Sequence, residues 1–467
     1  CRDLAVAETT QQNTTFYEGS TYEHQYFSIA GEPPQATWHP AATLLITGYT
    51  TSKSFSTSGW QQHFGNVVYQ CSGQTTFVDM LGNLKHIAGD LRISDTNGNI
   101  LRLSLDKKTL SVIEVGGDFI VEGNSEVWIS REGNTQLNVA GNMELRSVSA
   151  AASYLTTQGN GELNVAGNVL LSSVGALRFA SAGGGTGIFR IAGNVTMNSG
   201  LLTANAPGVG ILEFNSNTRQ TNSLSTDLQA VITNINNNAS ETEIISNHQL
   251  FGSIQCNAGN LILPEHFSLY GNLTVSEQAS VQCPETLSVL GVANQQLDLN
   301  GETLLNVKIN KPSGTTVTLT SAMHLGGYLH IESLNTDLIS NGNLTLLSQA
   351  DDGSSDASVY SLLAGSDVIG DVHVQRYMEG EARIYRYISM PVLNATVKDL
   401  QDDFPITGTF IDPSTGSGIN KSAPSFFYYD ESLAGEAGWT AYPKTGLAEE
   451  AILQCGLGYA AFIRNTT

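Results

Sequence analysis

The sequence predicts an all-β protein, a parallel β-helix (solenoid) of about ten or more coils, with an N-terminal cap and a C-terminal β-sandwich-like domain. Only 14% of the residues are charged while 47 are glycine, and Asn, Ser and Thr are abundant, which is typical of short strands and tight turns. A Gly-Asn motif recurs at a fixed step, and apolar residues alternate around it. The step of about 26 residues is too short for a propeller blade, which needs about 40 residues.

The repeat is clearest in three nearly identical segments, Leu137–Leu145, Leu163–Leu171 and Phe189–Met197, whose starting positions are equally spaced. Related corners precede and follow them at Gly65, Gly89, Gly117, Gly271 and Gly327. Taken as ten intervals, the distance from Gly65 to Gly327 gives coils of about 26 residues each. At ~4.8 Å per coil this predicts a rod of about 50 Å.

A second glycine track, at Gly133, Gly159 and Gly185, runs in phase with the first. Each period therefore holds at least two strands and two turns. Between residues 201 and 261 the motif fades into Asn-rich sequence, but the distance from Gly193 to Gly271 still equals three of the regular steps. We expect this segment to form further coils with degenerate corners.

Backbone conformation predicts why Gly and Asn recur at the corner. A bend between two strands needs φ > 0, which Gly and Asn adopt at least cost. Stacked coils would then align the polar corner residues into a ladder of hydrogen-bonded side-chain amides. The predicted ladder consists of Asp90, Asp118, Asn142, Asn168, Asn194 and Asn272. An alternative is that Asp90 and Asp118 bind Ca²⁺ or act as acid and base.

The motif divides the chain into three parts. Residues 1–60 lack the repeat and are expected to form an N-terminal β cap that covers the first unpaired coil. Residues 61–350 are expected to form the solenoid with coils of about 26 residues. After the interruption at 351–356, residues 370–467 change to sequence rich in Arg, Tyr and Phe, which suits an incomplete β-sandwich-like domain.

Five cysteines are present and none is spaced as a CxxC-type metal site. Cys256 and Cys283 are separated by about one repeat, so either a disulfide or a stack of buried thiols on adjacent coils is expected. Lipidation of Cys1 is a further alternative, because bacterial lipoproteins begin with cysteine. No cofactor is predicted beyond the Ca²⁺ alternative.

The net charge of −22 disfavours nucleic acid as a partner, because both molecules are polyanions. No run of about 18 apolar residues is present, so no transmembrane helix is predicted. An acidic, strand-rich chain with few charged residues in total is typical of a secreted protein with a solvated surface.

The aromatic C-terminal part contains motifs whose order resembles that in a known class of proteins. Five motifs define it: Val374–Met378, Ile384–Pro391, Pro424–Asp430, Gly438–Ala441 and Gly456–Phe462. Their order resembles that in large secreted surface proteins of the Bacteroidota, the class exported by the type IX secretion system that includes gliding-motility adhesins. The resemblance implies an extracellular location at the bacterial cell surface and the secretion machinery as a partner. Proteins of that class end in a sorting domain, so we expect Thr467 to be followed by further chain.

The leading hypothesis is a non-enzymatic surface scaffold or adhesin, with surface glycans or other surface proteins as ligands. The rival is a carbohydrate-active β-helix enzyme, a polysaccharide lyase or glycosidase, with charged side chains converging from adjacent coils. A component of a secretion or motility assembly is a third alternative. The charged candidates, each more easily read as solvent-facing, are Glu241, Glu243, Arg92, Arg102, Lys107 and Lys108. The aromatic groups around Tyr385, Tyr387 and 426–429 are read as sheet core in preference to a sugar-stacking surface.

Overall fold

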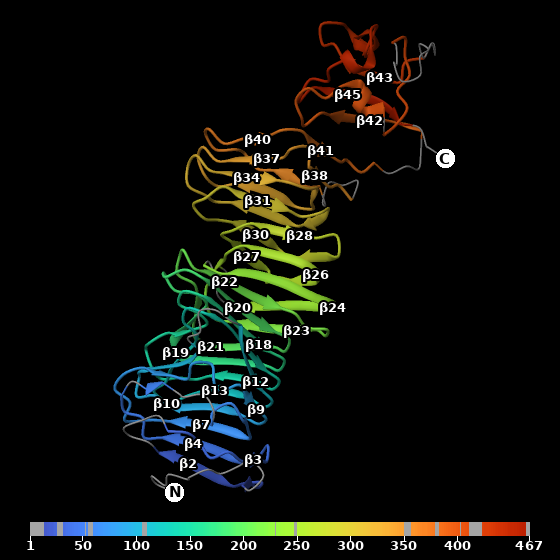
Figure 1. Ribbon diagram of the computed structural model, residues 1–467. Helices are drawn as coiled ribbons and strands as arrows, with labels where there is room; N and C mark the ends of the chain where they lie inside the picture. Colours follow the sequence, from blue (N-terminus) through green and yellow to red (C-terminus); the bar gives the residue numbers. More distant parts are fainter. Residues whose placement is uncertain are drawn as a thin grey trace. The chain divides into compact units, whose positions relative to one another are not determined.

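The computed structural model describes residues 14–25, 31–51, 53–54, 59–104, 110–228, 230–246, 250–349, 356–378, 383–401, 403–410 and 423–463. The chain forms two compact units, residues 1–343 with 359–370 and residues 344–358 with 371–467. The first is a parallel β-solenoid and the second contains a small antiparallel sheet (Figure 1). The predicted parallel β-helix is thereby confirmed. In the described residues, no helix is both long and apolar enough to cross a membrane.

A complete coil of the solenoid contains three strands. In one coil these are β15 (Asn134–Val139), β16 (Met143–Leu145) and β17 (Ser153–Tyr154). They pair in parallel with β18 (Asn160–Val165) and with the two ends of β19 (Val169–Arg178) in the next coil. Three columns of strands result, which we call columns 1, 2 and 3 in chain order. The Gly-Asn motif lies at the corner between columns 1 and 2.

The regular stack has about 13 turns, and short strands extend it at both ends. Column 1 contains, with β15 and β18, the strands β1 (Thr15–Phe16), β3 (Thr37–Trp38), β6 (His63–Phe64), β9 (His86–Ile87), β12 (Leu110–Val115), β20 (Thr186–Ile191), β22 (Val209–Phe214), the first parts of β24 (Ile232–Ser246) and β26 (Ile254–Ile262), β28 (Leu273–Val275), β31 (Gln295–Asp298), β34 (Thr316–Leu319), β37 (Asp337–Ile339) and β40 (Val368–Ile369).

Column 2 contains, with β16 and the first part of β19, the strands β2 (Thr21–Gln25), β4 (Thr43–Thr47), β7 (Asn66–Gln70), β10 (Leu91–Asp95), β13 (Phe119–Val121), the first part of β21 (Val195–Thr203), β23 (Gln220–Leu224), the last parts of β24 and β26, β29 (Ala279–Gln282), β32 (Glu302–Leu304) and β35 (Met323–Leu325). Column 3 contains, with β17 and the last parts of β19 and β21, the strands β5 (Lys53–Ser54), β8 (Val78–Asp79), β11 (Ile100–Ser104), β14 (Glu126–Ser130), β25 (Leu250–Phe251), β27 (His266–Leu269), β30 (Thr286–Val289), β33 (Asn306–Ile309) and β36 (Tyr328–Ile331). One boundary between the two units falls within strand β39 (Ser358–Val359).

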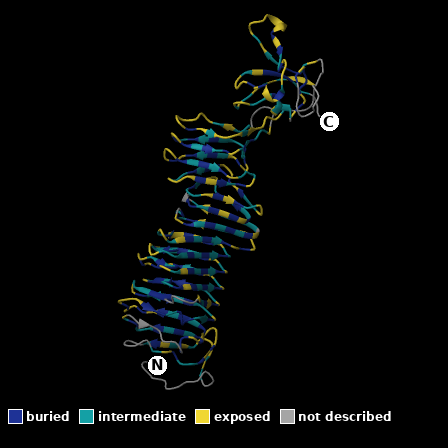
Figure 2. Ribbon diagram, turned by 45° about the horizontal axis from the view of Figure 1, so that its top comes forward, coloured by how far each residue is buried: buried dark blue, intermediate teal, exposed yellow. Residues whose placement is uncertain are grey.

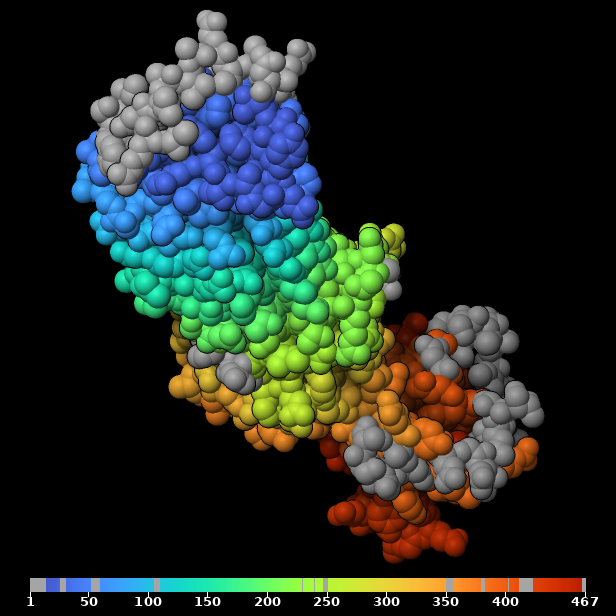
Figure 3. Space-filling model, turned by 90° about the horizontal axis from the view of Figure 1, so that it is seen from below, coloured from blue at the N-terminus to red at the C-terminus, as the bar shows by residue number. Residues whose placement is uncertain are grey.

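Inward-facing residues form the core because side chains alternate along each strand. Leu137, Leu163, Phe189 and Leu212 are equivalent residues on four consecutive coils, and all are fully buried. Figure 2 shows buried residues along the strands and exposed ones at many corners, and Figure 3 shows the first unit as successive bands of colour. Burial of one such side chain contributes about 1.5–3 kcal/mol, so the stack is held by a continuous apolar column.

The coil length is not constant, and the predicted average of about 26 residues per coil for 61–350 does not hold in the second half. Equivalent corner residues from Asn66 to Asn194 are 24, 28, 24, 26 and 26 residues apart. Further along, the spacing is 19 residues from Ser253 to Asn272 and 22 from Lys311 to Ser333. The later coils have shorter connections between their strands.

The solenoid also begins earlier than expected. In the segment 1–60, predicted as a cap outside the repeat, strand β2 pairs in parallel with β4, and β4 pairs with β7 of the first recognisable repeat. The described part of this segment therefore consists of stacked coils. Several of its aromatic residues are buried in the stack, such as Trp38, which packs edge-on to Phe64 at a ring distance of 5.3 Å.

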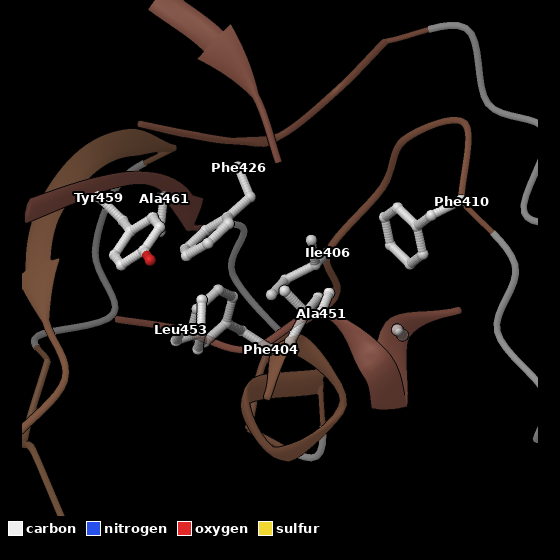
Figure 4. Packing of buried hydrophobic residues seen from close by; sticks show 10 residues of the cluster. Phe404, Ile406, Phe410, Phe426, Ala451, Leu453, Tyr459 and Ala461 are labelled. Atoms are coloured by element: carbon white, nitrogen blue, oxygen red, sulfur yellow. The ribbon is translucent and has the colours of Figure 1, made fainter. Parts of the chain in front are cut away.

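The second unit contains one antiparallel sheet in the order β42 (Ile384–Ser389), β45 (Gly458–Ile463), β43 (Phe426–Tyr429) and β44 (Trp439–Ala441). A core that includes Phe404, Phe426 and Leu453 packs on one face (Figure 4). Helix α1 (Val397–Gln401) and the 3₁₀ turns η1 (Gly435–Gly438) and η2 (Ala448–Glu450) accompany it, and β38 (Leu344–Leu346) pairs in parallel with β41 (Val372–Val374). Among the described residues of this unit there is one antiparallel sheet, not the two packed sheets of the predicted sandwich.

Candidate functional site

A row of polar side chains points outward from column 1. The residues of this row are equivalent positions on six consecutive coils, because each pairs in register with the next. We call it the groove row: His63, His86, Glu114, Asn138, Asn164 and Arg190. Their strand neighbours Val115, Val139 and Val165 point inward and are buried. The alternation of the strands therefore places every member of the row on the solvent side.

The groove row forms one side of a groove of about 520 Å³ that runs across these coils. Its floor is made by small residues at the corner after column 1: Ala88, Gly116, Ala140, Ala166 and Ala192. All but Ala192 are largely exposed, so a ligand in the groove would lie directly on them. Asn215 continues the lining at the far end.

Members of the groove row bond to one another along the stack. The amide Nδ2 of Asn138 donates to Glu114 Oε1 at 2.9 Å, and Nδ2 of Asn164 donates to Asn138 Oδ1 at 2.8 Å. Arg190 Nη1 lies 2.8 Å from Glu162 Oε2, and its Nε lies 3.4 Å from Glu213 Oε2. Each carboxamide retains a second N–H, and its oxygen has a further lone pair for a ligand. The arginine charge is balanced by two carboxylates from neighbouring coils.

Two histidines close the other end of the row. The rings of His63 and His86 stack face to face, with centroids 4.4 Å apart and planes 8° apart. Burial, and then the charge of His63, lowers the pKa of His86 below its ordinary value. His86 is therefore neutral at pH 7.

The predicted corner ladder lies beside the groove and has a different bonding pattern from the one expected. The side-chain oxygen of each corner residue accepts from the backbone N–H of its equivalent one coil later. These bonds join Asn66 to Asp90, Asp90 to Asp118, Asp118 to Asn142, Asn142 to Asn168 and Asn168 to Asn194, at 2.7–2.9 Å. An amide-to-side-chain bond is added at one step, from Asn142 Nδ2 to Asp118 Oδ1. Because only an oxygen is needed, Asp serves as well as Asn.

The conformational explanation for the corner was wrong. Gly141, Gly167 and Gly193 are not among the residues with positive φ, and neither are the asparagines that follow them. A Cβ on Gly167 would lie 2.5 Å from the carbonyl oxygen of Gly141, and one on Gly193 would lie 2.2 Å from that of Gly167. Glycine is required because adjacent coils approach one another too closely for a side chain.

Asn272 does not belong to this ladder. It precedes β28 in column 1, and its backbone N–H donates to Ser253 Oγ at 3.1 Å. The reason is the shortening of the coils. Ile191, Phe214, Ile235, Cys256 and Val275 are successive equivalent residues, so the chain completes four coils where the prediction had three.

The proposed disulfide between Cys256 and Cys283 is absent, and both are free buried thiols. Because the local coil is short, the neighbour of Cys256 on the next coil is Val275, and Cys283 follows strand β29 in column 2. Burial raises the pKa of Cys256 to about 12 and that of Cys283 to about 11. Cys1 lies outside the described residues.

The other charged candidates are engaged in contacts between coils. Arg219 bridges Glu241 and Glu243 at 3.5 and 2.9 Å. Arg92 Nη1 lies 2.9 Å from Glu122 Oε1.

Arg102 was predicted to face outward, but it is only 8% exposed and stacks 4.0 Å from the ring centre of Phe77, near Asp79. Lys107 and Lys108 lie outside the described residues. Asp90 and Asp118 each give one oxygen to the corner ladder, and the described residues contain no group of three or more His, Cys, Asp or Glu suited to a metal ion.

The aromatic residues of the second unit divide between two faces. Phe426 is buried in the core, whereas Tyr385, Tyr387 and Tyr429 are exposed on the opposite face of the sheet. Tyr387 stacks on Trp439 with ring centres 6.0 Å apart. The expectation that these aromatics form core therefore holds for Phe426 and not for the three tyrosines.

The groove row was missed at the sequence level although a signal for it exists. Glu114, Asn138, Asn164 and Arg190 each stand three residues before a motif glycine, and the floor residue stands one before it. Neither position is constant in type, whereas the recurring pair of Gly with Asn or Asp that follows forms a recognisable motif.

No protein-family model, curated protein or solved structure matches the chain. The solenoid and its groove are therefore the basis for any functional conclusion.

Proposed function

We propose that this protein is a non-enzymatic scaffold or adhesin segment of a bacterial cell surface, exported by the type IX secretion system. The observation that carries the proposal is the groove, which crosses consecutive coils of a rigid stack and so offers a long contact surface to an extended polymer. The charged side chains beside it bridge neighbouring coils, as Arg190 does between Glu162 and Glu213. The motif order of the C-terminal part supports the location and the secretion route.

The test uses the native cell and the purified chain. Biotinylation of intact cells with a membrane-impermeant reagent should label the protein, and beads coated with it should adhere to the cells or to their extracellular matrix. Ala166→Trp should fill the groove floor and abolish adhesion, because a ligand must lie on that residue. Ala151→Trp is the matched control, since Ala151 is exposed on the connection after β16 and does not line the groove. Equal adhesion by both variants, or a protein inaccessible to the reagent, would contradict the proposal.

A carbohydrate-active enzyme is the second candidate, and one observation favours it. His86 and Glu114 are in register on adjacent coils at the groove, as an acid and a base would be. Glu114→Gln separates the two functions. It should abolish turnover by an enzyme, whereas adhesion by a scaffold should persist. A component of a motility or secretion assembly would instead co-purify with the other proteins of that assembly.

A further inference from the structure

We infer that the groove binds a linear, uncharged polysaccharide chain that lies along the solenoid axis. The inference rests on the proposed function, in which the groove is the contact surface, and it adds the chemical class of the ligand. Four properties of the groove point to this class: its length, its backbone, its charge, and its carboxamide and methyl groups.

The length favours a polymer. The groove is lined from His63 to Asn215, across the coils that carry the groove row and one beyond. At ~4.8 Å per coil this is about 30 Å, several times the width of a sugar ring. A compact ligand would touch only two or three coils, whereas a chain would contact the same two positions, a polar side chain and a floor residue, once per coil.

The backbone disfavours a peptide bound by strand addition. That mode requires unpaired N–H and C=O groups at a sheet edge. Along the groove, the strands of column 1 are paired on both sides with neighbouring coils. The floor amides are used as well, since the N–H groups of Ala140, Ala166 and Ala192 each donate to the preceding coil at 2.9 Å. A ligand therefore meets side chains and not an open edge.

The charge disfavours a polyanion. Arg190 is the one arginine in the lining and is held by two carboxylates, while Glu114 adds a negative charge. The chain as a whole carries −22. An acidic polysaccharide or a nucleic acid would be repelled, because binding of polyanions depends on clustered cations.

The remaining groups match a neutral sugar chain. Asn138, Asn164 and Asn215 present carboxamides that donate and accept, as paired hydroxyl groups require. Ala140 and Ala166 present methyl groups to the C–H surface of a ring. On the two middle coils, Asn138 with Ala140 and Asn164 with Ala166 give the same pair of contacts, one carboxamide and one methyl, to successive units of a repeating chain.

Affinity electrophoresis of the purified chain tests the inference, with gels containing dextran, mannan or laminarin as neutral probes and alginate or hyaluronan as acidic ones. At least one neutral polymer should retard the wild-type protein and the Ala151→Trp control, with at least tenfold weaker retardation of Ala166→Trp. Thermal melting and circular dichroism of both variants would establish that the fold is kept. Asn138→Ala with Asn164→Ala, which leaves the floor open, should weaken binding separately.

Retardation by acidic polymers only, by none of the probes, or equally in wild type and Ala166→Trp would overturn the inference. Its failure can be told apart from failure of the proposed function. If Ala166→Trp abolishes adhesion to cells but no neutral polymer binds, the groove is a contact surface for another ligand class. If cell adhesion is unaffected, the proposed function itself fails.

Discussion

The side-chain oxygen of Asn168 accepts a hydrogen bond from the backbone N–H of Asn194 at 2.9 Å. One coil earlier, the side-chain oxygen of Asn142 accepts a hydrogen bond from the backbone N–H of Asn168, also at 2.9 Å. The ladder thus depends on one acceptor oxygen per coil and not on the amide group. Asp90 and Asp118 fit the same positions without any change in the pattern.

Asn168→Ala and Asn168→Asp should therefore differ in stability. The alanine variant removes the acceptor for the Asn194 N–H and should lower the free energy of unfolding by ~1 kcal/mol, since the site is solvent-accessible and water replaces part of the bond. The aspartate variant keeps an acceptor oxygen and should stay within about 0.5 kcal/mol of wild type. Urea denaturation followed by circular dichroism measures both. Equal losses in the two variants would mean that the amide N–H carries the contribution.

The reactivity of the cysteine thiols tests the coil spacing in the second half of the solenoid. Because burial raises the pKa of Cys256 to about 12 and of Cys283 to about 11, both are protonated and shielded at pH 8. N-ethylmaleimide should label exposed Cys455 in the native protein, and the two buried cysteines only after denaturation. Peptide mapping by mass spectrometry reads out all three. A cross-linked peptide containing Cys256 and Cys283 would contradict the short coil that pairs Cys256 with Val275.

The sequence was sufficient for the fold class because the repeat and the period-two alternation are local properties. Coil boundaries are not local, since they follow from which strands pair. The distance from Gly193 to Gly271 divides evenly into three regular steps, yet the pairing from Ile191 to Val275 completes four shorter coils. Arithmetic on glycine positions alone could not reveal that Asn272 stands at another corner.

The candidate site was less accessible to sequence reasoning. Recurring glycines marked the corner, but they are there for close approach between coils, as the 2.5 Å separation at Gly167 shows. The groove row varies from His86 to Glu114 to Asn138, so it has no motif. Only the register between coils shows that these residues form one line.

The exposed face of the C-terminal sheet should show a measurable coupling between Tyr387 and Trp439. They lie on the two edge strands β42 and β44, and their rings meet with planes 25° apart. Of the two strands between them, β45 contributes Gly458 and Ala460 to this face, which leaves space for the rings. A double-mutant cycle with Tyr387→Ala and Trp439→Ala should give a coupling of ~0.5–1.5 kcal/mol in the stability of this sheet. Hydrogen exchange of residues 384–389 and 439–441 reports it, and additive effects would contradict the stacking.

Glu122 should make the solenoid sensitive to acid. Burial alone would raise its pKa. Hydrogen bonds from Arg92 and Arg146, on the coils before and after it, and the charge of Arg92 lower the pKa below its ordinary value. A depressed folded-state pKa stabilises the protein above the unfolded pKa of about 4.3, and this stabilisation is lost as the pH falls through the folded pKa. Wild type should therefore exceed Glu122→Gln in unfolding free energy at pH 7, and the difference should shrink below pH 4. In a background of Arg92→Met and Arg146→Met, the same substitution should have little effect at either pH. A difference that is constant from pH 7 to pH 3 would show that Glu122 acts through packing and not through its charge.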